Sequence, residues 1–333
     1  MAAAAPLLAA CGASSSSQFL TDPPAALPPP IVAPLVAHDS RKSWLAPDIG
    51  KSGQLLFVSD GGTYDVDIFT LPDLKLAGRL TGFKFPTGEC SDRHGDVWIA
   101  NYLKHEMLEY SHEGKRLNAI VLAHLNPYGC AVNPTDGALA VTDAEQSNYG
   151  PGEVLVYAKP SARPIILRNP EQEYYLYPAY DSHGDLWVTG FSATEYPLIS
   201  SCGASSCRTV VLRGGSIFNP GGIAWDNGKR KWIVFDGYCH ESGATCSYPV
   251  SMDGRVGSPT TYLTSVGGQP CAVFQPAMAT IGNQTIVAAS DNEYACLGYK
   301  YSSVDLWSYS FGGTPLRYRS GVIYPWGAAV SAK

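Results

Sequence analysis

The sequence contains few charged residues and no concentration of positive charge. Asp, Glu, Lys and Arg make up 16% of its 333 residues, against about 25% in a typical globular protein. Acidic residues outnumber basic ones, 29 to 23, so the formal net charge is −6. Because no cluster of Lys and Arg is available to neutralise phosphates, we expect no nucleic-acid partner.

Long apolar runs and helical patterns are missing as well. No apolar run reaches the roughly 18 to 20 residues that a membrane-spanning helix needs, and no stretch of about ten residues combines helical spacing with helix caps. The sequence contains no G-x-S-x-G elbow, phosphate-binding glycine loop or H-E-x-x-H motif. We therefore expect little α-helix, and no common catalytic motif points to an enzyme.

The first eleven residues form a short apolar segment that ends in Cys11, followed by Gly12 and a run of serines. This segment resembles a bacterial lipoprotein signal, and the resemblance implies that Cys11 carries a lipid. The segment lacks the Lys or Arg that usually begins a signal peptide, so the alternative is an Ala-rich terminus with an incidental cysteine. A lipid would attach the protein to a membrane without spanning it.

Residues 12–45 are rich in Ser, Pro and Ala and almost free of charge. Such a composition favours extended, polyproline-like conformations and offers no periodic apolar face to bury. We expect this segment to be a tether that precedes one folded domain at residues 46–333.

That domain contains an internal repeat. Each copy has a Pro, small residues, an alternating stretch, a polar turn with Gly, an apolar run and a closing Asp or Asn. The copies cover residues 85–101, 126–143, 177–190, 219–236 and 269–291, and their prolines together with that of a partial copy are Pro86, Pro127, Pro178, Pro220, Pro270 and Pro325. The spacing of roughly 40 to 55 residues is typical of one four-stranded propeller blade per repeat.

A sixth copy is divided between the two ends of the domain. The C-terminal end begins the pattern at Pro325 and stops, whereas residues 53–60 supply the apolar run and the closing Asp without a preceding Pro-Gly strand. Sharing one sheet between the two ends would cover the open edges of a ring. The sequence therefore predicts an all-β fold, a six-bladed β-propeller of four-stranded antiparallel blades, with the C-terminal strand innermost in the first blade.

This order of Pro-x-Gly, Asp-x-x-Gly, apolar run and Asp or Asn resembles NHL-type six-bladed β-propellers. That superfamily also holds gluconolactonase-like and strictosidine-synthase-like enzymes, and the resemblance is strongest to bacterial lipoproteins of this architecture. It covers residues 53–333 and implies the fold. It does not select a function, because propellers serve as lactonases, lyases and binding modules alike.

Eight cysteines remain after Cys11, an even number that favours disulfides in a chain outside the cytoplasm. Two pairs can each close a short loop, and a third pair occupies matching positions of successive repeats. The expected pairs are Cys202 with Cys207, Cys239 with Cys246, Cys90 with Cys130, and, as the remaining pair, Cys271 with Cys296. Zinc binding by the two local pairs is the alternative, and it would need reducing conditions and a second matched half-site.

One face of the ring is expected to carry long, Tyr-rich loops, whereas the turns on the opposite face are short. Tyrosine provides a large rigid surface with a polar tip, which suits sugar rings, peptides or a protein partner. The alternative is that these tyrosines only cover strand ends. The candidate ligand-binding residues are Tyr102, Tyr128, Tyr175, Tyr177, Tyr238, Tyr299 and Trp326.

Two sets of acidic residues could bind a metal. The first ends the second strand of five blades: Asp60, Asn101, Asp143, Asp236 and Asp291. These side chains could hold Ca²⁺, but their repetition favours hydrogen bonds to turn amides. The second candidate is Glu89, because gluconolactonase-like enzymes, which the chain resembles, place a Glu and several Asn or Asp around a divalent ion. The matching positions here are apolar: Cys130, Tyr180, Ile223, Ala272 and Ala328.

The sequence therefore favours a monomeric, extracytoplasmic, lipid-anchored or secreted propeller that binds a ligand on its Tyr-rich face without catalysis. Carbohydrate, peptide and envelope protein are the ligand classes considered, and an envelope scaffold is a related interpretation. The alternative is a lactonase- or lyase-type enzyme that uses a divalent ion near Glu89. No cofactor is expected, and Ca²⁺ belongs only to this alternative.

Overall fold

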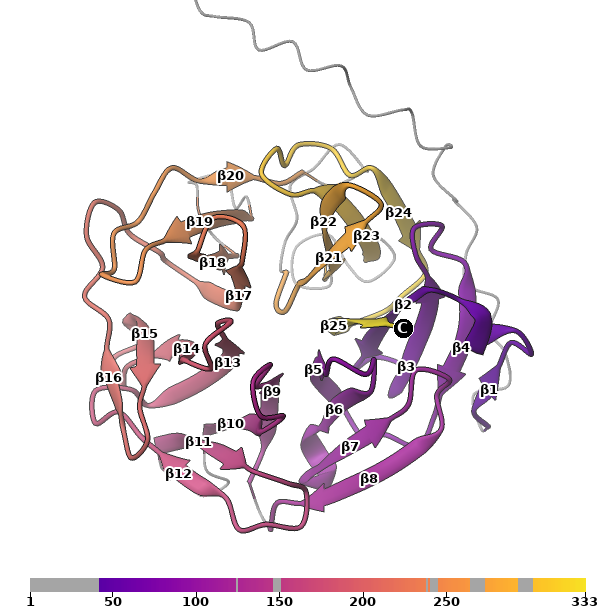
Figure 1. Cartoon of the computed structure of the whole chain (residues 1–333), viewed down its shortest axis with the longest axis horizontal. Helices are drawn as coiled ribbons and strands as arrows, with labels where there is room; N and C mark the ends of the chain where they lie inside the picture. Colours follow the sequence, from indigo (N-terminus) through magenta and orange to yellow (C-terminus); the bar gives the residue numbers. More distant parts are fainter. Residues whose placement is uncertain are drawn as a thin grey trace, which may run out of the picture.

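The computed structural model describes residues 42–123, 125–145, 151–237, 239, 245–263, 273–292 and 302–333. Its strands form six sheets arranged in a ring (Figure 1), which confirms the predicted six-bladed β-propeller. The helical elements in these ranges are two 3-10 helices, η1 (Ile49–Lys51) and η2 (Tyr102–Lys104). No helix in the described ranges is long and apolar enough to cross a membrane.

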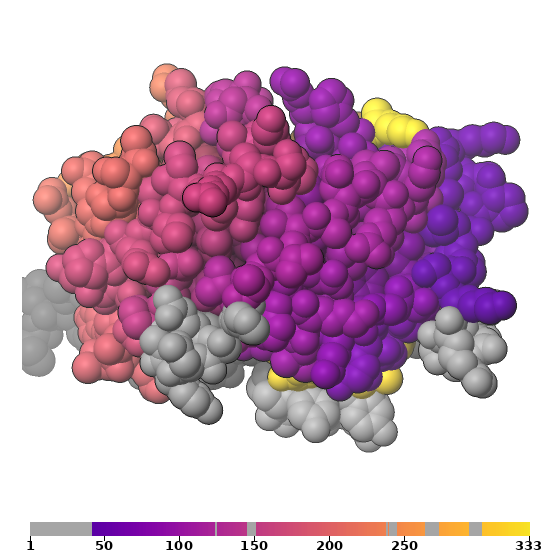
Figure 2. All heavy atoms as spheres, turned by 90° about the horizontal axis from the view of Figure 1, so that it is seen from below, coloured from indigo at the N-terminus to yellow at the C-terminus, as the bar shows by residue number. Residues whose placement is uncertain are grey.

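Blades 2 to 6 each contain four antiparallel strands in sequence order from the axis outward. Blade 2 contains β5 (Pro86–Ser91), β6 (Val97–Asn101), β7 (Glu106–Tyr110) and β8 (Arg116–Val121). Blade 3 contains β9 (Pro127–Val132), β10 (Leu139–Glu145), β11 (Pro151–Tyr157) and β12 (Ile165–Leu167). Figure 2 views the ring from its edge, over the outer strands of these two blades.

The next three blades continue around the ring. Blade 4 contains β13 (Tyr174–Tyr180), β14 (Leu186–Phe191), β15 (Pro197–Cys202) and β16 (Cys207–Thr209). Blade 5 contains β17 (Pro220–Asp226), β18 (Lys231–Asp236), β19 (Cys246–Val250) and β20 (Thr260–Thr261). Blade 6 contains β21 (Ala277–Ile281), β22 (Gln284–Asp291), β23 (Ser303–Ser308) and β24 (Arg317–Ser320).

Blade 1 joins the two ends of the domain. Its order from the axis outward is β25 (Pro325–Ala332), β2 (Gln54–Asp60), β3 (Asp65–Thr70), β4 (Leu76–Leu80) and β1 (Trp44–Leu45). The C-terminal strand β25 is innermost and pairs with β2 along its whole length, as the divided sixth repeat predicted. The short strand β1 adds to the outer edge of β4 and lies within the segment that the sequence analysis assigned to a tether.

The repeat prolines occupy equivalent positions in four of the six blades. In each of these blades the proline lies opposite the polar residue that ends the second strand, and a bulge follows it. The pairs are Pro86 with Asn101, Pro127 with Asp143, Pro220 with Asp236, and Pro325 with Asp60.

The alignment of the other two blades by their prolines was wrong. In blade 4, Tyr175 pairs with Gly190 and takes the position of the blade proline, whereas Pro178 pairs with Val188, beyond the bulge. In blade 6, the pairing of Ala277 with Ala288 places Pro276 in that same position beyond the bulge. A proline can flank the bulge on either side because neither position donates to the ladder. Pro270 lies outside the described residues.

The apolar core lies between neighbouring blades, where the faces of adjacent sheets meet. Trp187 of blade 4 stacks on Trp232 of blade 5, with ring centroids 4.9 Å apart, and both are almost fully buried. Close to the axis the backbones themselves touch. A Cβ atom on Gly88 would lie 2.4 Å from the Tyr128 carbonyl oxygen, so only glycine fits there.

Three of the four expected disulfides are present. Cys90–Cys130 joins the inner strands of blades 2 and 3, Cys202–Cys207 joins β15 to β16, and Cys239–Cys246 closes a short loop. The zinc alternative for the two local pairs is therefore wrong. Three disulfides suggest an oxidising, extracytoplasmic environment. Cys271, Cys296 and Cys11 lie outside the described residues.

Candidate binding surface at the channel mouth

The inner strands line a cavity of about 330 Å³ on the axis of the ring. At the level of Glu89, the other blades contribute Cys130, Pro178, Ile223, Pro276 and Ala328. Three of the five positions expected from the sequence are thus confirmed. The other two expected positions, Tyr180 and Ala272, were wrong. Pro178 of blade 4 and Pro276 of blade 6 lie at this level instead, because in these blades the proline follows the bulge and the sequence alignment was shifted.

Glu89 is buried between blades 1 and 2, with 1% of its surface exposed. Its Oε1 accepts a hydrogen bond of 2.5 Å from Ser59 Oγ of blade 1, and its Oε2 has no hydrogen-bond partner within the described ranges. Burial raises the pKa of Glu89 well above its ordinary range, although the Ser59 hydrogen bond opposes the shift.

The surroundings of Glu89 do not fit a calcium site. Ca²⁺ takes 6 to 8 oxygen ligands, whereas the other five side chains at this level are apolar or belong to a disulfide. Nowhere in the described ranges do three His, Cys, Asp or Glu side chains converge as metal ligands would. The described residues therefore provide no coordination set for the metal-dependent alternative.

Two large side chains fill the axis above Glu89. Gly88 directly precedes Glu89, and three other blades also have glycine at the equivalent position. Blade 4 has Tyr177 there and blade 6 has Gln275. The Gln275 amide accepts from the Glu89 backbone N–H and donates to the Glu89 carbonyl oxygen, at 2.8 Å each. Gln275 thereby joins blade 6 to blade 2 across the innermost strand of blade 1.

The polar residues at the ends of the second strands hold the chain that enters the inner strand of the same blade. Asp60 accepts hydrogen bonds from the backbone N–H groups of Ile323 and Tyr324, at 2.8 and 2.9 Å. Asn101 accepts one from Lys84, and Asp143 accepts one from Asn126. This arrangement favours the structural interpretation of these residues over a calcium ring.

Replacing Asp236 with Ala is expected to lower the free energy of unfolding by about 2 kcal/mol, because two partly buried backbone N–H groups lose their carboxylate acceptor. Those groups belong to Phe218 and Asn219, at 2.8 and 2.9 Å. The measurement is urea denaturation of both proteins with and without EDTA. If Asp236 is structural, the variant should be less stable than the parent by the same amount with and without EDTA. If Asp236 helps to bind calcium, EDTA should lower the free energy of unfolding of the parent itself.

Six half-buried aromatic residues meet at the end of the channel where the chain enters the inner strands. We call this group the aromatic platform, and it consists of Phe85, Tyr102, Tyr128, Phe274, Tyr324 and Trp326. Trp326 is its centre: it stacks on Phe274 with ring centroids 4.2 Å apart. Its ring also contacts Tyr324 edge-on at 5.4 Å and Tyr128 at 5.7 Å.

The platform extends from Trp326 towards blade 2. Phe85 lies 5.5 Å from Trp326 and 6.0 Å from Tyr102, measured between ring centroids. Tyr102 in turn lies 6.4 Å from Tyr128. The six rings therefore form one connected set of contacts around Trp326.

The structure brings together three of the predicted residues, Tyr102, Tyr128 and Trp326. Tyr177 lies below the platform, 5.3 Å from Tyr128 and 1% exposed, and burial raises the pKa of both hydroxyls. Tyr175 lies elsewhere: it is fully buried, and its hydroxyl donates to the Asn169 carbonyl oxygen. These contacts give Tyr175 a place in the core. Tyr238 and Tyr299 lie outside the described residues.

Phe85 and Phe274 were not among the predicted residues. Tyr324 lies in one of the Tyr-rich loops expected on this face but was not among the candidate ligand-binding residues. The sequence position of Phe85 and Tyr324 could have identified them, because each directly precedes a blade proline. Asn126 and Asn219 occupy the same position in blades 3 and 5. The chain at this position is held by the second-strand Asp or Asn, through the N–H of Tyr324 in blade 1 and that of Lys84, next to Phe85, in blade 2. Both aromatic residues therefore lie at the channel mouth. Phe274 gave no such signal, since its blade was aligned on Pro270.

Comparison with known proteins identifies the fold alone. No family model and no curated protein sequence matches this chain. A chain in the crystal structure of a nidogen/laminin complex is 15% identical with a TM-score of 0.63, and the match covers 84% of this chain and 98% of that one. A protein of unknown function from Bacteroides caccae is 14% identical, with a TM-score of 0.59 over 85% and 100% of the two chains.

A functionally unknown protein from Desulfotomaculum acetoxidans is also similar. It is 9% identical with a TM-score of 0.55, over 84% of this chain and 99% of that one. Together with the sheet order, these similarities define the protein as a six-bladed β-propeller. At such low identity they carry no information about its ligand.

Proposed function

We propose that this propeller is a non-catalytic binding protein whose ligand contacts the aromatic platform. The observation that carries the proposal is the gathering of six half-buried aromatic residues from blades 1, 2, 3 and 6 at one end of the channel. Aromatic rings offer large apolar faces that lose little conformational freedom on binding. The platform consists of aromatic side chains, which favours stacking contacts with the ligand.

Carbohydrate is the ligand class that this surface suits best, because sugar rings stack on aromatic faces while tyrosine hydroxyls reach their polar groups. A protein partner is the second candidate. It is supported by the similar chain from the nidogen/laminin structure, which is a complex of two proteins. A scaffold role in the cell envelope would use the same surface.

The proposed location is the cell envelope. The three disulfides support an oxidising compartment, and the lipobox-like segment supports attachment through Cys11. The NHL-type assignment and the monomeric state belong to this proposal as well. Mass spectrometry of the protein from its native membrane fraction would detect or exclude a diacylglyceryl group on Cys11.

The proposed function is tested on a glycan microarray with the full chain. Tyr102→Ala and Trp326→Ala should each weaken binding of any retained glycan at least tenfold, because each removes a ring from the platform. Phe311→Ala is the matched control, since Phe311 is 78% exposed and lies in a turn after β23. Equal binding by the parent and both platform variants would contradict the proposal.

Absence of any retained glycan would exclude carbohydrate as the ligand class. The same three variants would then be compared on an array of peptides. Each variant is also melted, and a change in binding counts only where the variant keeps a cooperative transition.

A further inference from the structure

The outer edge of blade 4 is incomplete. β16 pairs only with Ser200, Ser201 and Cys202, so the first half of β15, which pairs with β14 on its inner side, has no outer strand beside it within the described ranges. The chain leaves β16 with a hydrogen bond of 2.8 Å from Val210 N–H to the Ile199 carbonyl oxygen. It then crosses to blade 5, where Arg213 exchanges backbone hydrogen bonds with Gly254 and Val256. We call Val210–Arg213 the bridge segment.

An apolar groove of about 380 Å³ lies on one side of the bridge segment. It lies between β15 and the residues that follow the bridge, and none of its 12 lining residues is charged. Three of them are unusually exposed: Tyr196 at 72%, Val211 at 65% and Phe218 at 59%. Exposed apolar side chains gathered around one groove are typical of a contact surface.

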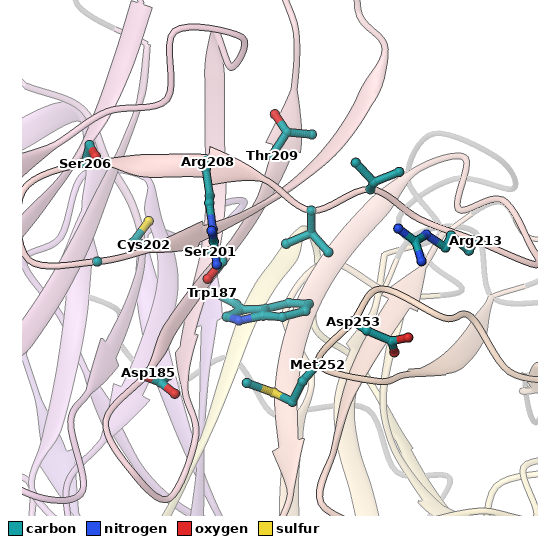
Figure 3. A pocket seen from close by; sticks show the side chains of 13 residues that line it. Asp185, Trp187, Ser201, Cys202, Ser206, Arg208, Thr209, Arg213, Met252 and Asp253 are labelled. Carbon is teal, nitrogen blue, oxygen red and sulfur yellow. The ribbon is translucent and has the colours of Figure 1, made fainter.

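A second groove, of about 620 Å³, lies on the other side and shares Thr209, Val210 and Val211 with the first. We call it the arginine groove. Figure 3 shows Arg208 on one side of it and Arg213 on the other, with Trp187 and Met252 between them. Met252 is 48% exposed, whereas Trp187 is 2% exposed and presents only a small part of its ring.

Neither arginine of this groove forms an ion pair within the part of the chain that the structure describes. Asp253 and Asp185 also line the groove. Asp253 is engaged locally: a hydrogen bond from Ser251 lowers its pKa, with a smaller contribution from the charge of Arg255. Asp185 lies on the side of Arg208, away from Arg213 (Figure 3). The groove therefore holds two positive and two negative side chains, and its two guanidinium groups have no ion-pair partner within the described residues, so each can pair with a carboxylate of a ligand.

We propose that the two grooves together bind an extended segment of a partner protein in which apolar residues are followed by acidic residues. The grooves share the bridge segment as a common wall, so a segment that crosses Val211 would reach both. Its apolar residues would occupy the uncharged groove, and its carboxylates would pair with Arg208 and Arg213. Arginine pairs well with carboxylates because its planar group can donate two parallel hydrogen bonds.

A small anion is a weaker candidate for this surface. It would engage the two arginines but leave Tyr196, Val211 and Phe218 exposed, whereas an extended segment covers both grooves. This site lies on the outer edge of blades 4 and 5, so it is independent of the aromatic platform.

The test uses arrays of synthetic heptapeptides in which three apolar positions are followed by three Asp or Glu positions. A second array carries Lys at the acidic positions, and a third carries Ser at the apolar positions. The full chain should be retained by the first array, and at least tenfold less by the other two. Raising the salt concentration should weaken retention, because the guanidinium–carboxylate pairs are exposed to solvent.

The double variant Arg208→Ser/Arg213→Ser and the single variant Val211→Asp should each weaken retention at least tenfold. Arg116→Ser is the matched control, because Arg116 is an exposed arginine on the outer strand of blade 2. All of these positions are on the surface, so the melting temperatures should agree with the parent's. The proposal is overturned by equal retention of the three arrays, by no retention on any of them, or by full retention of the double variant.

Discussion

Removal of residues 325–333 is expected to abolish cooperative unfolding of the propeller. The truncation deletes β25, which pairs with β2 from Pro325 opposite Asp60 to Ala332 opposite Gln54. It leaves blade 1 without its inner strand and opens the ring between blades 6 and 2. The expected loss is on the order of 10 kcal/mol, because several ladder hydrogen bonds at about 1 kcal/mol each disappear together with the contacts between blades. That loss is comparable to the whole stability of a typical domain.

The contacts between β25 and its neighbours explain why the effect should extend beyond blade 1. Ala328 N–H donates to the Gln275 carbonyl oxygen of blade 6, and Ser91 Oγ of blade 2 donates to the Val330 carbonyl oxygen. The buried His112 lies 2.7 Å from Ser331 Oγ and donates through Nε2 to the Ser52 carbonyl oxygen. β25 is therefore bonded to three blades.

Circular dichroism during thermal unfolding measures this prediction. Deletion of Lys333 alone is the control, because this residue is exposed and its ion pair with Glu113 lies on the surface. The control should unfold like the parent. A protein lacking residues 325–333 that also unfolds like the parent would show that β25 does not close the ring.

The second large effect is expected from Glu89→Gln, and it should grow with pH. The unfolded chain releases the Glu89 proton near the ordinary pKa of about 4.3, whereas burial keeps the proton on the folded protein to a much higher pH. Between these two values the unfolded state binds fewer protons than the folded state. The free energy of unfolding therefore falls as pH rises, by about 1.4 kcal/mol per pH unit from this group.

Glutamine resembles the protonated carboxyl group in shape and can still accept the hydrogen bond from Ser59 Oγ. The variant should therefore match the parent near pH 4 and become progressively more stable than the parent above that pH. Urea denaturation at pH 4 to 8 measures the difference. Glu195→Gln, at an exposed position, is the control and should leave the pH dependence unchanged. A constant difference between Glu89→Gln and the parent would contradict a raised pKa.

This second result also bears on the metal-dependent alternative. A Glu89 that coordinated a divalent ion would be deprotonated, and its replacement by Gln would lower the stability at neutral pH in the presence of that ion. The structure predicts the opposite sign. The direction of the change near pH 7 thus distinguishes a buried neutral acid from a metal ligand.

The candidate site was only partly predictable from the sequence. Tyr102 and Tyr128 were identified because they lie in or beside loops of one face, and Trp326 was included with them. The same reasoning included Tyr175. Tyr175 and Tyr177 are two residues apart, so regular alternation would place them on the same face, but the bulge between Tyr175 and Pro178 changes the direction of Tyr177 relative to Tyr175. Blade 4 lacks the Pro-x-Gly sequence that accompanies the bulge in four other blades, so the repeat pattern alone did not locate this bulge.

The bridge segment shows a second limit of sequence reasoning. Nothing in the sequence of Val210–Arg213 distinguishes it from an outer strand that continues to pair. Its grooves exist because β16 stops at Thr209 and the chain bonds to Gly254 and Val256 of the next blade. Such contacts join residues about 40 positions apart, and they depend on how two finished sheets pack.

The sequence by itself determined the number of blades, the sharing of blade 1 between the two ends, and the cysteine pairs at matching or adjacent positions. Each of these is recorded in a local pattern that repeats along the chain, and the alternation and turn residues of one blade do not depend on its neighbours. Only the tertiary structure decided which rings meet around Trp326, that Glu89 is enclosed beside Ser59, and where grooves open on the outer edge. Those features arise between blades, where burial and contact are set by the closure of the ring.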